Sequence, residues 1–209
     1  MRERGSGRTR RAWVALPVVV ASLVLAVVPA AGAADPSPTE TAHLYANDAG
    51  SGDAFGWAIA VDGDTMVVGA READNVHGTD AGAAYVFVRS PGSGWTLRAA
   101  LTAPDGAAND MFGEAVAISG DTILVGARED DTPAGAEAGS VYEYRLTAGF
   151  WMYRDHWFAP DAAAGDYFGD SVAIVGDTAM VGATHDDNAN GVDAGALYVV
   201  LKVGVSRRV

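Results

Sequence analysis

The apolar residues of this chain come in short runs that are separated by glycine-containing turns. Between Trp57 and Ala70 the sequence reads WAIAVDGDTMVVGA, which is two runs of about six residues around a Gly-Asp turn. Short runs rich in Val, Ile and Ala predict strands, and the glycine predicts a tight hairpin. A third run, GAAYVFVRS, and a fourth, GWTLRAALTAP, follow before Asp105. We therefore predict four consecutive strands in this part of the chain.

The same pattern of runs and turns occurs three times. The Phe-Gly pair at Phe55 recurs 57 residues later at Phe112, and again 56 residues later at Phe168. The other landmarks shift by the same steps: GDT at Gly63, Gly120 and Gly176, VGA at Val68, Val125 and Val181, and AG at Ala81, Ala138 and Ala194. This regularity predicts three structural repeats, at residues 55–104, 112–160 and 168–203, within a repeat region of 43–205.

Polarity changes from the first predicted strand of each repeat to the last. The first two strands are apolar on both faces, which predicts burial on both sides, whereas the fourth is half polar and predicts an outer position. A meander that is buried inside and wet outside is typical of a propeller blade, which buries its faces against neighbouring blades. The predicted fold is all-β, with β-propeller-type blades of four-stranded antiparallel meanders in an incomplete, open arc of about three blades.

Large and small residues occupy fixed places in each repeat. An aromatic anchor is expected at the start of each inner strand, at Phe55, Phe112 and Phe168. The glycine behind each anchor is expected to let neighbouring backbone approach closely, at Gly56, Gly113 and Gly169. A further glycine falls inside each second strand, where it predicts a bulge or close packing, at Gly69, Gly126 and Gly182.

These landmarks carry a family resemblance. FGWAIAV…VVGA, FGEAVAI…LVGA and FGDSVAI…MVGA resemble the FG-GAP repeat, also called the integrin-alpha β-propeller repeat, from about Leu44 to Val203. The resemblance implies a propeller, usually of seven blades, with an extracellular role in ligand binding or cell contact, and the chain looks like the bacterial, exported subtype. Integrin-type repeats hold calcium in a long loop on the first hairpin. Here that hairpin is VDGDT, ISGDT or IVGDT, too short for a cation that needs about six to eight oxygens.

Acidic residues gather instead in the loop between the second and third predicted strands. The third copy, THDDNANGVDAG, places oxygen-bearing side chains at alternate positions before a glycine, as in the first half of a calcium-binding loop. The candidate calcium ligands are Asp186, Asn188, Asn190 and Asp193. The closing acid comes one position early, so a solvated, hydrogen-bonded loop is the other interpretation. No other metal or cofactor is predicted.

The N-terminal segment differs from the repeats. A basic head, an apolar run from Ala12 to Ala30 and an Ala-x-Ala end predict a signal peptide at 1–33, followed by a flexible linker at 34–42. An uncleaved membrane anchor is the alternative, although Pro17 and Pro29 interrupt the apolar run. Export by the general or the twin-arginine route stays open. The expected location is secreted or cell-surface, and residues 206–209 form a short tail.

Charge and cysteine content narrow the range of functions. The chain has a formal net charge of −13, and removal of residues 1–33 would leave nine basic and 26 acidic residues, a net charge of −17. A protein of this charge repels phosphate backbones, so no nucleic-acid partner is expected. The chain has no cysteine, so no disulfide stabilises the fold.

No catalytic constellation stands out in the sequence, and we predict that the protein is not an enzyme. The histidines show no metal-binding spacing, and no serine lies in a G-x-S-x-G motif. Acidic residues that recur with the repeat, such as Asp53 and Asp64, are expected to bond turn backbone. The aromatic residues of the fourth strands either pack between blades or form a rim that stacks on a sugar or a partner: Trp95, Trp151, Tyr153, Trp157 and Phe158.

Three repeats raise the question of closure, since propellers close with about four to eight blades. The third repeat ends in KVGVSRRV, which matches no fourth strand, and TAHLYAND at residues 41–48 matches a fourth strand without a blade of its own. We expect an open arc or a shortened product with self-association through open blade faces, and a self-assembled larger ring is the alternative. The predicted function is an exported, non-catalytic binding, adhesion or scaffold module for an unknown protein or carbohydrate ligand. A truncated remnant of a propeller domain attached to an extracellular hydrolase is the alternative.

Overall fold

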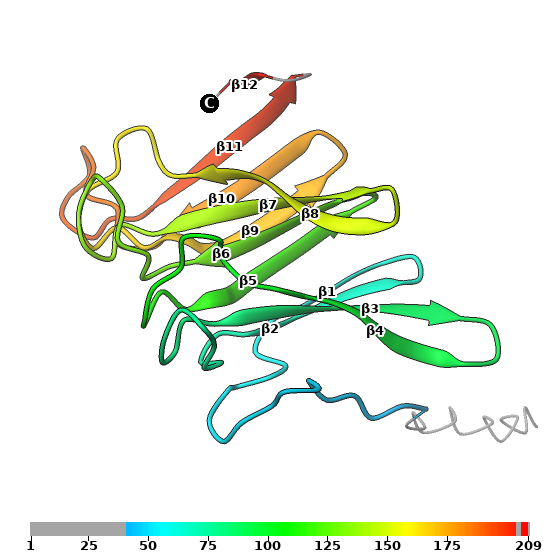
Figure 1. The fold of residues 1–209 in the computed structure, drawn as a ribbon. Helices are drawn as coiled ribbons and strands as arrows, with labels where there is room; N and C mark the ends of the chain where they lie inside the picture. The colour runs from blue at the N-terminus through cyan, green and yellow to red at the C-terminus, as the bar shows by residue number, and fades with distance from the viewer. Residues whose placement is uncertain (1–40, 204–205, 209) are drawn as a thin grey trace, which may run out of the picture. The chain divides into compact units, whose positions relative to one another are not determined.

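The structure, a computed structural model, describes residues 41–203 and 206–208 (Figure 1). The predicted signal peptide, most of the predicted linker and residue 209 lie outside the described residues. Across the described part of the chain, no helix is long and apolar enough to cross a membrane. This part is all-β, and its strands form three antiparallel sheets in chain order.

Each repeat folds into one antiparallel meander, in which strands that follow each other along the chain are neighbours in the sheet. Sheet 1 consists of β1 (Ile59–Asp62), β2 (Thr65–Ala70), β3 (Ala83–Ser90) and β4 (Gly94–Leu101). Sheet 2 consists of β5 (Phe112–Ser119), β6 (Thr122–Ala127), β7 (Ser140–Thr147) and β8 (Phe150–Trp157). Sheet 3 consists of three long strands, β9 (Phe168–Val175), β10 (Thr178–Ala183) and β11 (Ala196–Val203), and of the three-residue β12 (Ser206–Arg208). The predicted fold of propeller-type meanders is confirmed.

The first hairpin of each sheet is a two-residue turn. Asp62 pairs with Thr65 in sheet 1, and Ser119 pairs with Thr122 in sheet 2. Gly63 in the first of these turns has a φ angle of 57°, a left-handed conformation that glycine adopts without strain. The hairpin therefore reverses the chain directly and carries no inserted loop.

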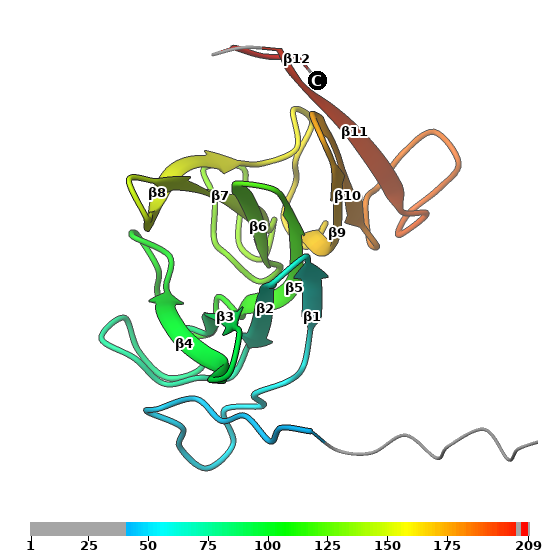
Figure 2. The same ribbon diagram turned by 90° about the vertical axis from the view of Figure 1, so that its right-hand side faces the viewer.

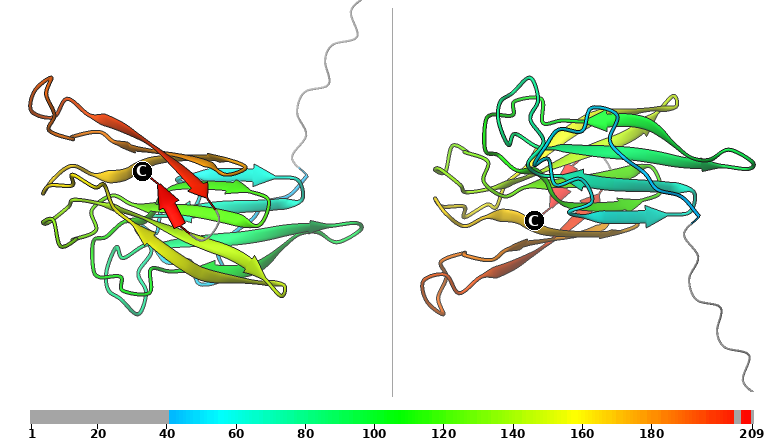
Figure 3. Two further views of the ribbon diagram at one scale, coloured as in Figure 1. Left: turned by 90° about the horizontal axis from the view of Figure 1, so that it is seen from above. Right: turned by 90° about the horizontal axis from the view of Figure 1, so that it is seen from below.

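Sheet 2 lies between the other two sheets. Its inner strand β5 packs against β1 and β2 on one side and against β9 on the other (Figures 2 and 3). Almost all of β5 is buried, whereas Ile59 and Val61 of β1 are 62% and 57% exposed and Val175 of β9 is 69% exposed. The prediction that the first two strands are buried on both faces is therefore correct for sheet 2. In sheets 1 and 3 it holds for most of β2 and β10 and is wrong for β1 and most of β9, because only sheet 2 has a described neighbour on each side.

Two of the three apolar cores in the described part of the chain lie between sheets, and the third lies on sheet 1 beneath Leu44 and Ala46. Val67 of sheet 1 packs with Val116 and Ile123 of sheet 2 in the first core. Leu124 of sheet 2 packs with Val181 of sheet 3 in the second. Since β6 presents Ile123 to sheet 1 and Leu124 to sheet 3, the central sheet completes a core with each of its neighbours.

Both ends of the repeat region differ from the sequence predictions. Residues 41–46 form no strand; Leu44 and Ala46 pack instead on sheet 1 beside Tyr85. An extended segment becomes a strand where a sheet edge supplies hydrogen bonds, and no described strand pairs with this segment. At the other end a short fourth strand forms where none was predicted, because β12 pairs with Leu201–Val203. From Ala196 to Val200, the outer edge of β11 has no strand paired with it among the described residues.

Candidate functional site

The phenylalanine landmarks lie where one sheet meets the next. Phe112 and Phe168 are buried, whereas Phe55, which has no preceding sheet, is partly exposed. The Phe112 peptide N–H donates to the Ala81 carbonyl at 3.1 Å, and the Phe168 N–H donates to the Ala138 carbonyl at 2.9 Å. Each anchor is thus bonded to the loop of the preceding sheet.

The landmark glycines line the same junctions. Two pairs lie in direct backbone contact across them: Gly69 with Gly113, and Gly126 with Gly169. In each pair, a Cβ on the first glycine would overlap the carbonyl oxygen of the second. The absence of a side chain is what lets the two sheets approach this closely. The other two landmark glycines, Gly56 and Gly182, lie on faces where no neighbouring sheet packs among residues 41–203 and 206–208.

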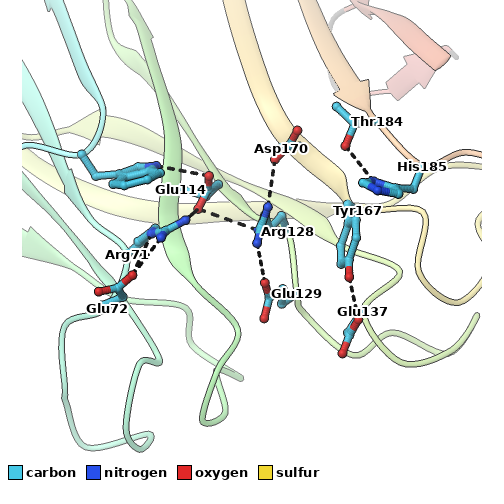
Figure 4. A network of polar contacts seen from close by, with 11 residues as sticks. Arg71, Glu72, Glu114, Arg128, Glu129, Glu137, Tyr167, Asp170, Thr184 and His185 are labelled. Atoms are coloured by element: carbon cyan, nitrogen blue, oxygen red, sulfur yellow. Dashed lines mark hydrogen bonds and ion pairs between the residues drawn. The ribbon is translucent and has the colours of Figure 1, made fainter. Parts of the chain in front are cut away.

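A chain of charged side chains crosses both junctions (Figure 4). Arg71 of sheet 1 donates to Glu114 of sheet 2 at 3.0 Å, and Arg128 of sheet 2 lies 3.7 Å from Asp170 of sheet 3. Arg128 also lies 3.9 Å from Glu114, so one carboxylate faces two guanidinium groups. The Trp57 indole stacks with Arg71 and donates to Glu114 at 3.2 Å. Since only 8% of the Glu114 side chain is exposed, this carboxylate is shielded from water, and its ion pair with Arg71 joins sheet 2 to sheet 1.

Another set of acidic residues shapes the turn before each phenylalanine. Each carboxylate accepts the peptide N–H three residues earlier, at 2.6 to 2.7 Å, in Asp53, Asp110 and Asp166. Burial raises the pKa of Asp110 to about 6. Asp64 differs from the expectation that it bonds turn backbone, because its carboxylate pairs with Arg89 of β3 at 2.8 Å.

A tyrosine on the third strand of each sheet bonds a carboxylate that lies seven residues before the first residue of its repeat. The pairs are Tyr85–Asp48 at 2.8 Å, Tyr142–Asp105 at 3.0 Å and Tyr198–Asp161 at 2.8 Å. In sheets 2 and 3 the phenol also donates to a second carboxylate, Asp130 at 3.2 Å and Asp186 at 2.6 Å. Burial, together with the neighbouring carboxylates, raises the pKa of all three phenols, so they stay protonated donors. Sequence reasoning missed these pairs, although their constant separation of 37 residues is a detectable signal.

Sheet 2 adds a serine and a histidine to its cluster. The His156 ring stacks on Tyr142 with centroids 4.3 Å apart, and its Nε2 lies 3.2 Å from Asp130. Ser140 donates to the same carboxylate at 2.5 Å. A nucleophilic serine needs a base that takes its proton and a path to substrate. Ser140 is fully buried and bonds Asp130, so we interpret this cluster as structural.

The candidate calcium ligands lie in the loop between β10 and β11. Asp186 is buried and accepts the Tyr198 phenol, while the Asn188 amide donates to Asp186 at 3.2 Å. The Asn188 side-chain oxygen accepts the Asn190 peptide N–H at 2.9 Å, and Asp193 is exposed. Among the described residues, no group of three or more His, Cys, Asp or Glu side chains is placed to hold a metal ion. The calcium site stays a prediction.

The aromatic residues of the outer strands divide between core and surface. Trp157 is buried in the core between sheets 2 and 3, and Trp95 and Trp151 are half-buried against the other cores. Tyr153 and Phe158 are 45% and 49% exposed. Packing between sheets therefore accounts for Trp151 and Trp157, whereas Trp95 packs on residues of its own sheet and of the segment before it, and Tyr153 and Phe158 are exposed rings.

A groove lies between the outer strands of sheets 1 and 2. It has a volume of about 570 Å³, and its walls are Val88, Arg98 and Ala99 on one side and Leu146, Phe150, Trp151 and Met152 on the other. Phe150 and Met152 are 71% and 55% exposed. An exposed ring, a thioether and a guanidinium beside a hollow suit a ligand with a flat apolar face. Sequence reasoning did not single out Phe150 or Met152.

The sequence of the chain matches a known family of repeats. The FG-GAP repeat matches three segments of the chain, at residues 38–87, 95–144 and 151–200. The chain belongs to the FG-GAP repeat family. No curated protein matches it. FG-GAP repeats form propeller-type binding or scaffold modules, and this chain forms three of their sheets.

The FG-GAP units are out of phase with the sheets. The unit at 95–144 begins in β4, the outer strand of sheet 1, and ends in β7, the third strand of sheet 2. The unit at 151–200 begins in β8 and ends in β11 in the same way. One FG-GAP unit therefore spans two sheets and contains the junction between them.

Proposed function

We propose that this FG-GAP protein is an exported, non-catalytic binding module whose ligand, a protein segment or a carbohydrate, binds in the groove between the outer strands of sheets 1 and 2. The observation that carries the proposal is the groove itself, whose lining includes both the exposed Phe150 ring and Arg98. Ring stacking supplies apolar contact to a sugar or an aromatic side chain, and the guanidinium supplies hydrogen-bond donors.

Binding fits the polar residues of the chain better than catalysis does. FG-GAP repeats are in general non-catalytic. The side chains that recur with the repeat are engaged in bonds that hold turns and junctions, as Asp53 and Glu114 illustrate. A catalytic pair would need groups that face a substrate cavity, and the groove lining supplies a cation and apolar surface.

The test uses arrayed glycans and a library of short peptides as probes for the purified protein. Phe150→Ala is expected to weaken binding of any captured probe about tenfold, since aromatic stacking contributes about 0.5–1.5 kcal/mol beyond the area that it buries. Phe158→Ala is the matched control, because Phe158 is an exposed ring outside the groove lining. Equal losses in both variants, or no captured probe in either array, would argue against the groove.

Export is tested separately. The N-terminal sequence supports cleavage after Ala33. Expression of the full chain in a secreting host should release a protein whose mass corresponds to residues 34–209. Recovery of the intact chain from the cells alone would contradict export.

A further inference from the structure

The two end sheets carry the two halves of the junction that occurs twice inside the chain. The trailing face of sheet 3 is formed by Met180, Leu197 and Val199. Met180 and Leu197 occupy the repeat positions that pack against the next sheet in sheets 1 and 2, and Val199 occupies that of Val86, which does so in sheet 1. The leading face of sheet 1 (Ile59, Val61 and Met66) occupies the positions that pack against the preceding sheet in sheets 2 and 3. Leu197 and Val199 are 64% and 51% exposed, and Ile59 is 62% exposed. Both faces therefore offer apolar surface shaped by the same repeat.

The glycines at these two faces are present without the contact that they make elsewhere. Gly182 is equivalent to Gly69 and Gly126, whose missing side chains admit the backbone of the next sheet. A Cβ on Gly182 would meet the Ser171 hydroxyl of its own sheet. Gly56, equivalent to the partner glycine in those pairs, has no atom near its added Cβ. The trailing and leading faces each keep one half of a glycine pair.

The charged pair of the junctions is replaced on both faces at once. Thr184 stands where Arg71 and Arg128 stand in the first two sheets, and Trp57 stands where Glu114 and Asp170 stand in the next two. If a sheet with an acid at the position of Glu114 packed on sheet 3, the acid would be buried opposite Thr184 with no arginine to pair with it. If sheet 1 of a second copy packed there, Trp57 would occupy that position, and no unpaired charge would be buried.

The segment before sheet 1 matches the strand that sheet 3 lacks. HLYAND at residues 43–48 aligns with HWFAPD at 156–161, which ends the outer strand of sheet 2, and with ALTAPD at 100–105. Ala100 pairs with Tyr85 and His156 pairs with Tyr142 in their sheets. By the same register a strand at residues 41–46 would place His43 opposite Tyr198, along the unpaired edge of β11.

Histidine and carboxylates occur together across the repeats. In sheet 2, His156 lies 3.2 Å from Asp130 and 3.5 Å from Asp105. Sheet 1 has neither partner, since Ala73 replaces the buried acid and Ala100 the histidine. In sheet 3 both carboxylates are present, because Asp161 and Asp186 bond Tyr198. Sheet 3 has no described outer-strand histidine of its own, and the residue that aligns with His156 in the segment before sheet 1 is His43.

We propose that the chain assembles head to tail with a second copy, whose residues 41–46 add to the edge of β11 and whose leading face packs on the trailing face of sheet 3. The interface repeats the two internal junctions, with Gly182 against Gly56 and His43 between Asp161 and Asp186. It is heterologous, so a ring forms if the rotation closes. One internal contact would not form at this interface. Asp62 and Ser119 each accept the peptide N–H of the hairpin glycine in the next sheet, and the equivalent residue of sheet 3, Val175, has no acceptor in its side chain. The proposal is independent of ligand binding in the groove.

The assembly is tested by the mass of the purified protein in light scattering and sedimentation over a range of concentrations, after mass spectrometry has defined the processed chain. The native protein is expected to exceed one chain in mass. Gly182→Ala is expected to weaken association at least tenfold while the thermal unfolding curve is retained, because the Ser171 hydroxyl can rotate away. Val192→Glu, on an exposed loop of the same repeat, is the control and should assemble normally. A native protein that remains one chain in mass at all concentrations overturns the proposal.

Two variants, each altered on one end face only, test whether the trailing face of one copy binds the leading face of another or whether two identical faces bind each other. Leu197→Glu with Val199→Glu disables the trailing face, and Ile59→Glu with Val61→Glu disables the leading face. Each variant alone is expected to remain a monomer, and an equimolar mixture should form a heterodimer through the one intact junction. Self-association of either folded variant, or no association in the mixture, overturns the proposed geometry.

The absence of cysteine allows a direct test of the register. Ala84 pairs with Leu101, and Val141 with Trp157, so Leu197 should face Leu44 of the second copy. The variant carrying Leu44→Cys and Leu197→Cys is expected to oxidise to a species of more than one chain on a denaturing gel. Leu44→Cys with Phe150→Cys is the mismatched control. A cross-link within one chain, or equal cross-linking in the control, overturns the second copy as the occupant.

Discussion

Gly126 of sheet 2 lies against the carbonyl group of Gly169 in sheet 3, with no space between them for a side chain. Gly126→Ala should therefore force the two sheets apart and lower the free energy of unfolding by about 3 kcal/mol. Gly182→Ala is the matched control, because that position faces no neighbouring sheet within the chain. Urea denaturation at low protein concentration measures both variants, and similar losses would contradict a junction-specific role for Gly126.

Asp130 joins three side chains of sheet 2. Asp130→Ala removes the acceptor of the buried Ser140 hydroxyl and a partner of Tyr142 and His156. Because a buried donor without an acceptor is costly, we expect a loss of about 3 kcal/mol in the free energy of unfolding. Asp177→Ala, at an exposed hairpin of sheet 3, should change stability by less than about 0.5 kcal/mol. A small effect of Asp130→Ala in denaturant titration would mean that the cluster is not structural.

Asp110 should make stability depend on pH in a predictable direction. Its pKa is raised from 3.8 to about 6, mainly by burial. Between these values the native state holds a proton that the unfolded chain releases, so the free energy of unfolding falls as pH rises, and the cost is complete above about pH 6. Asp110→Asn keeps an acceptor for the Ala107 N–H and cannot ionise. Denaturation at pH 4 to 7 should show the variant gaining stability relative to the native protein as pH rises, and a constant difference would contradict the assigned ionisation.

Calcium should leave the thermal unfolding temperature unchanged at millimolar concentration. Binding at the loop after β10 would require Asp186 to release the Tyr198 phenol and Asn188 to release the Asn190 N–H. Differential scanning calorimetry with calcium, with magnesium and with chelator measures the effect. A rise in unfolding temperature with calcium that Asp193→Asn abolishes would instead support the site predicted from the sequence.

The strand order could be predicted from the sequence because every strand and turn carries a local signal that recurs three times. Burial could not be predicted in the same way. Ile59 and Val116 occupy the same repeat position, yet Ile59 is 62% exposed and Val116 8%. The difference comes from the neighbouring sheet, which the local pattern does not contain. For the same reason residues 41–46 have the pattern of a strand and form none.

The groove could not be predicted from the sequence, because its lining depends on how two sheets meet. Arg98 and Phe150 belong to different sheets and come together because β4 and the hairpin of β7 and β8 lie side by side. The tyrosine–carboxylate pairs could have been found, since Tyr142 follows Asp105 at the same distance along the chain as Tyr198 follows Asp161. The signal for these pairs is the spacing of 37 residues between an aspartate and a tyrosine, which is the same in all three repeats.

The phase difference between FG-GAP units and sheets has a consequence for how such proteins change in length. A duplicated unit of 56 or 57 residues brings an outer strand for the sheet before it and three inner strands for the sheet after it. Insertion of such a unit therefore interrupts no hydrogen-bonded sheet and supplies its own glycine contacts on both sides. Gain or loss of one whole unit would therefore change the number of sheets while each internal sheet keeps four strands.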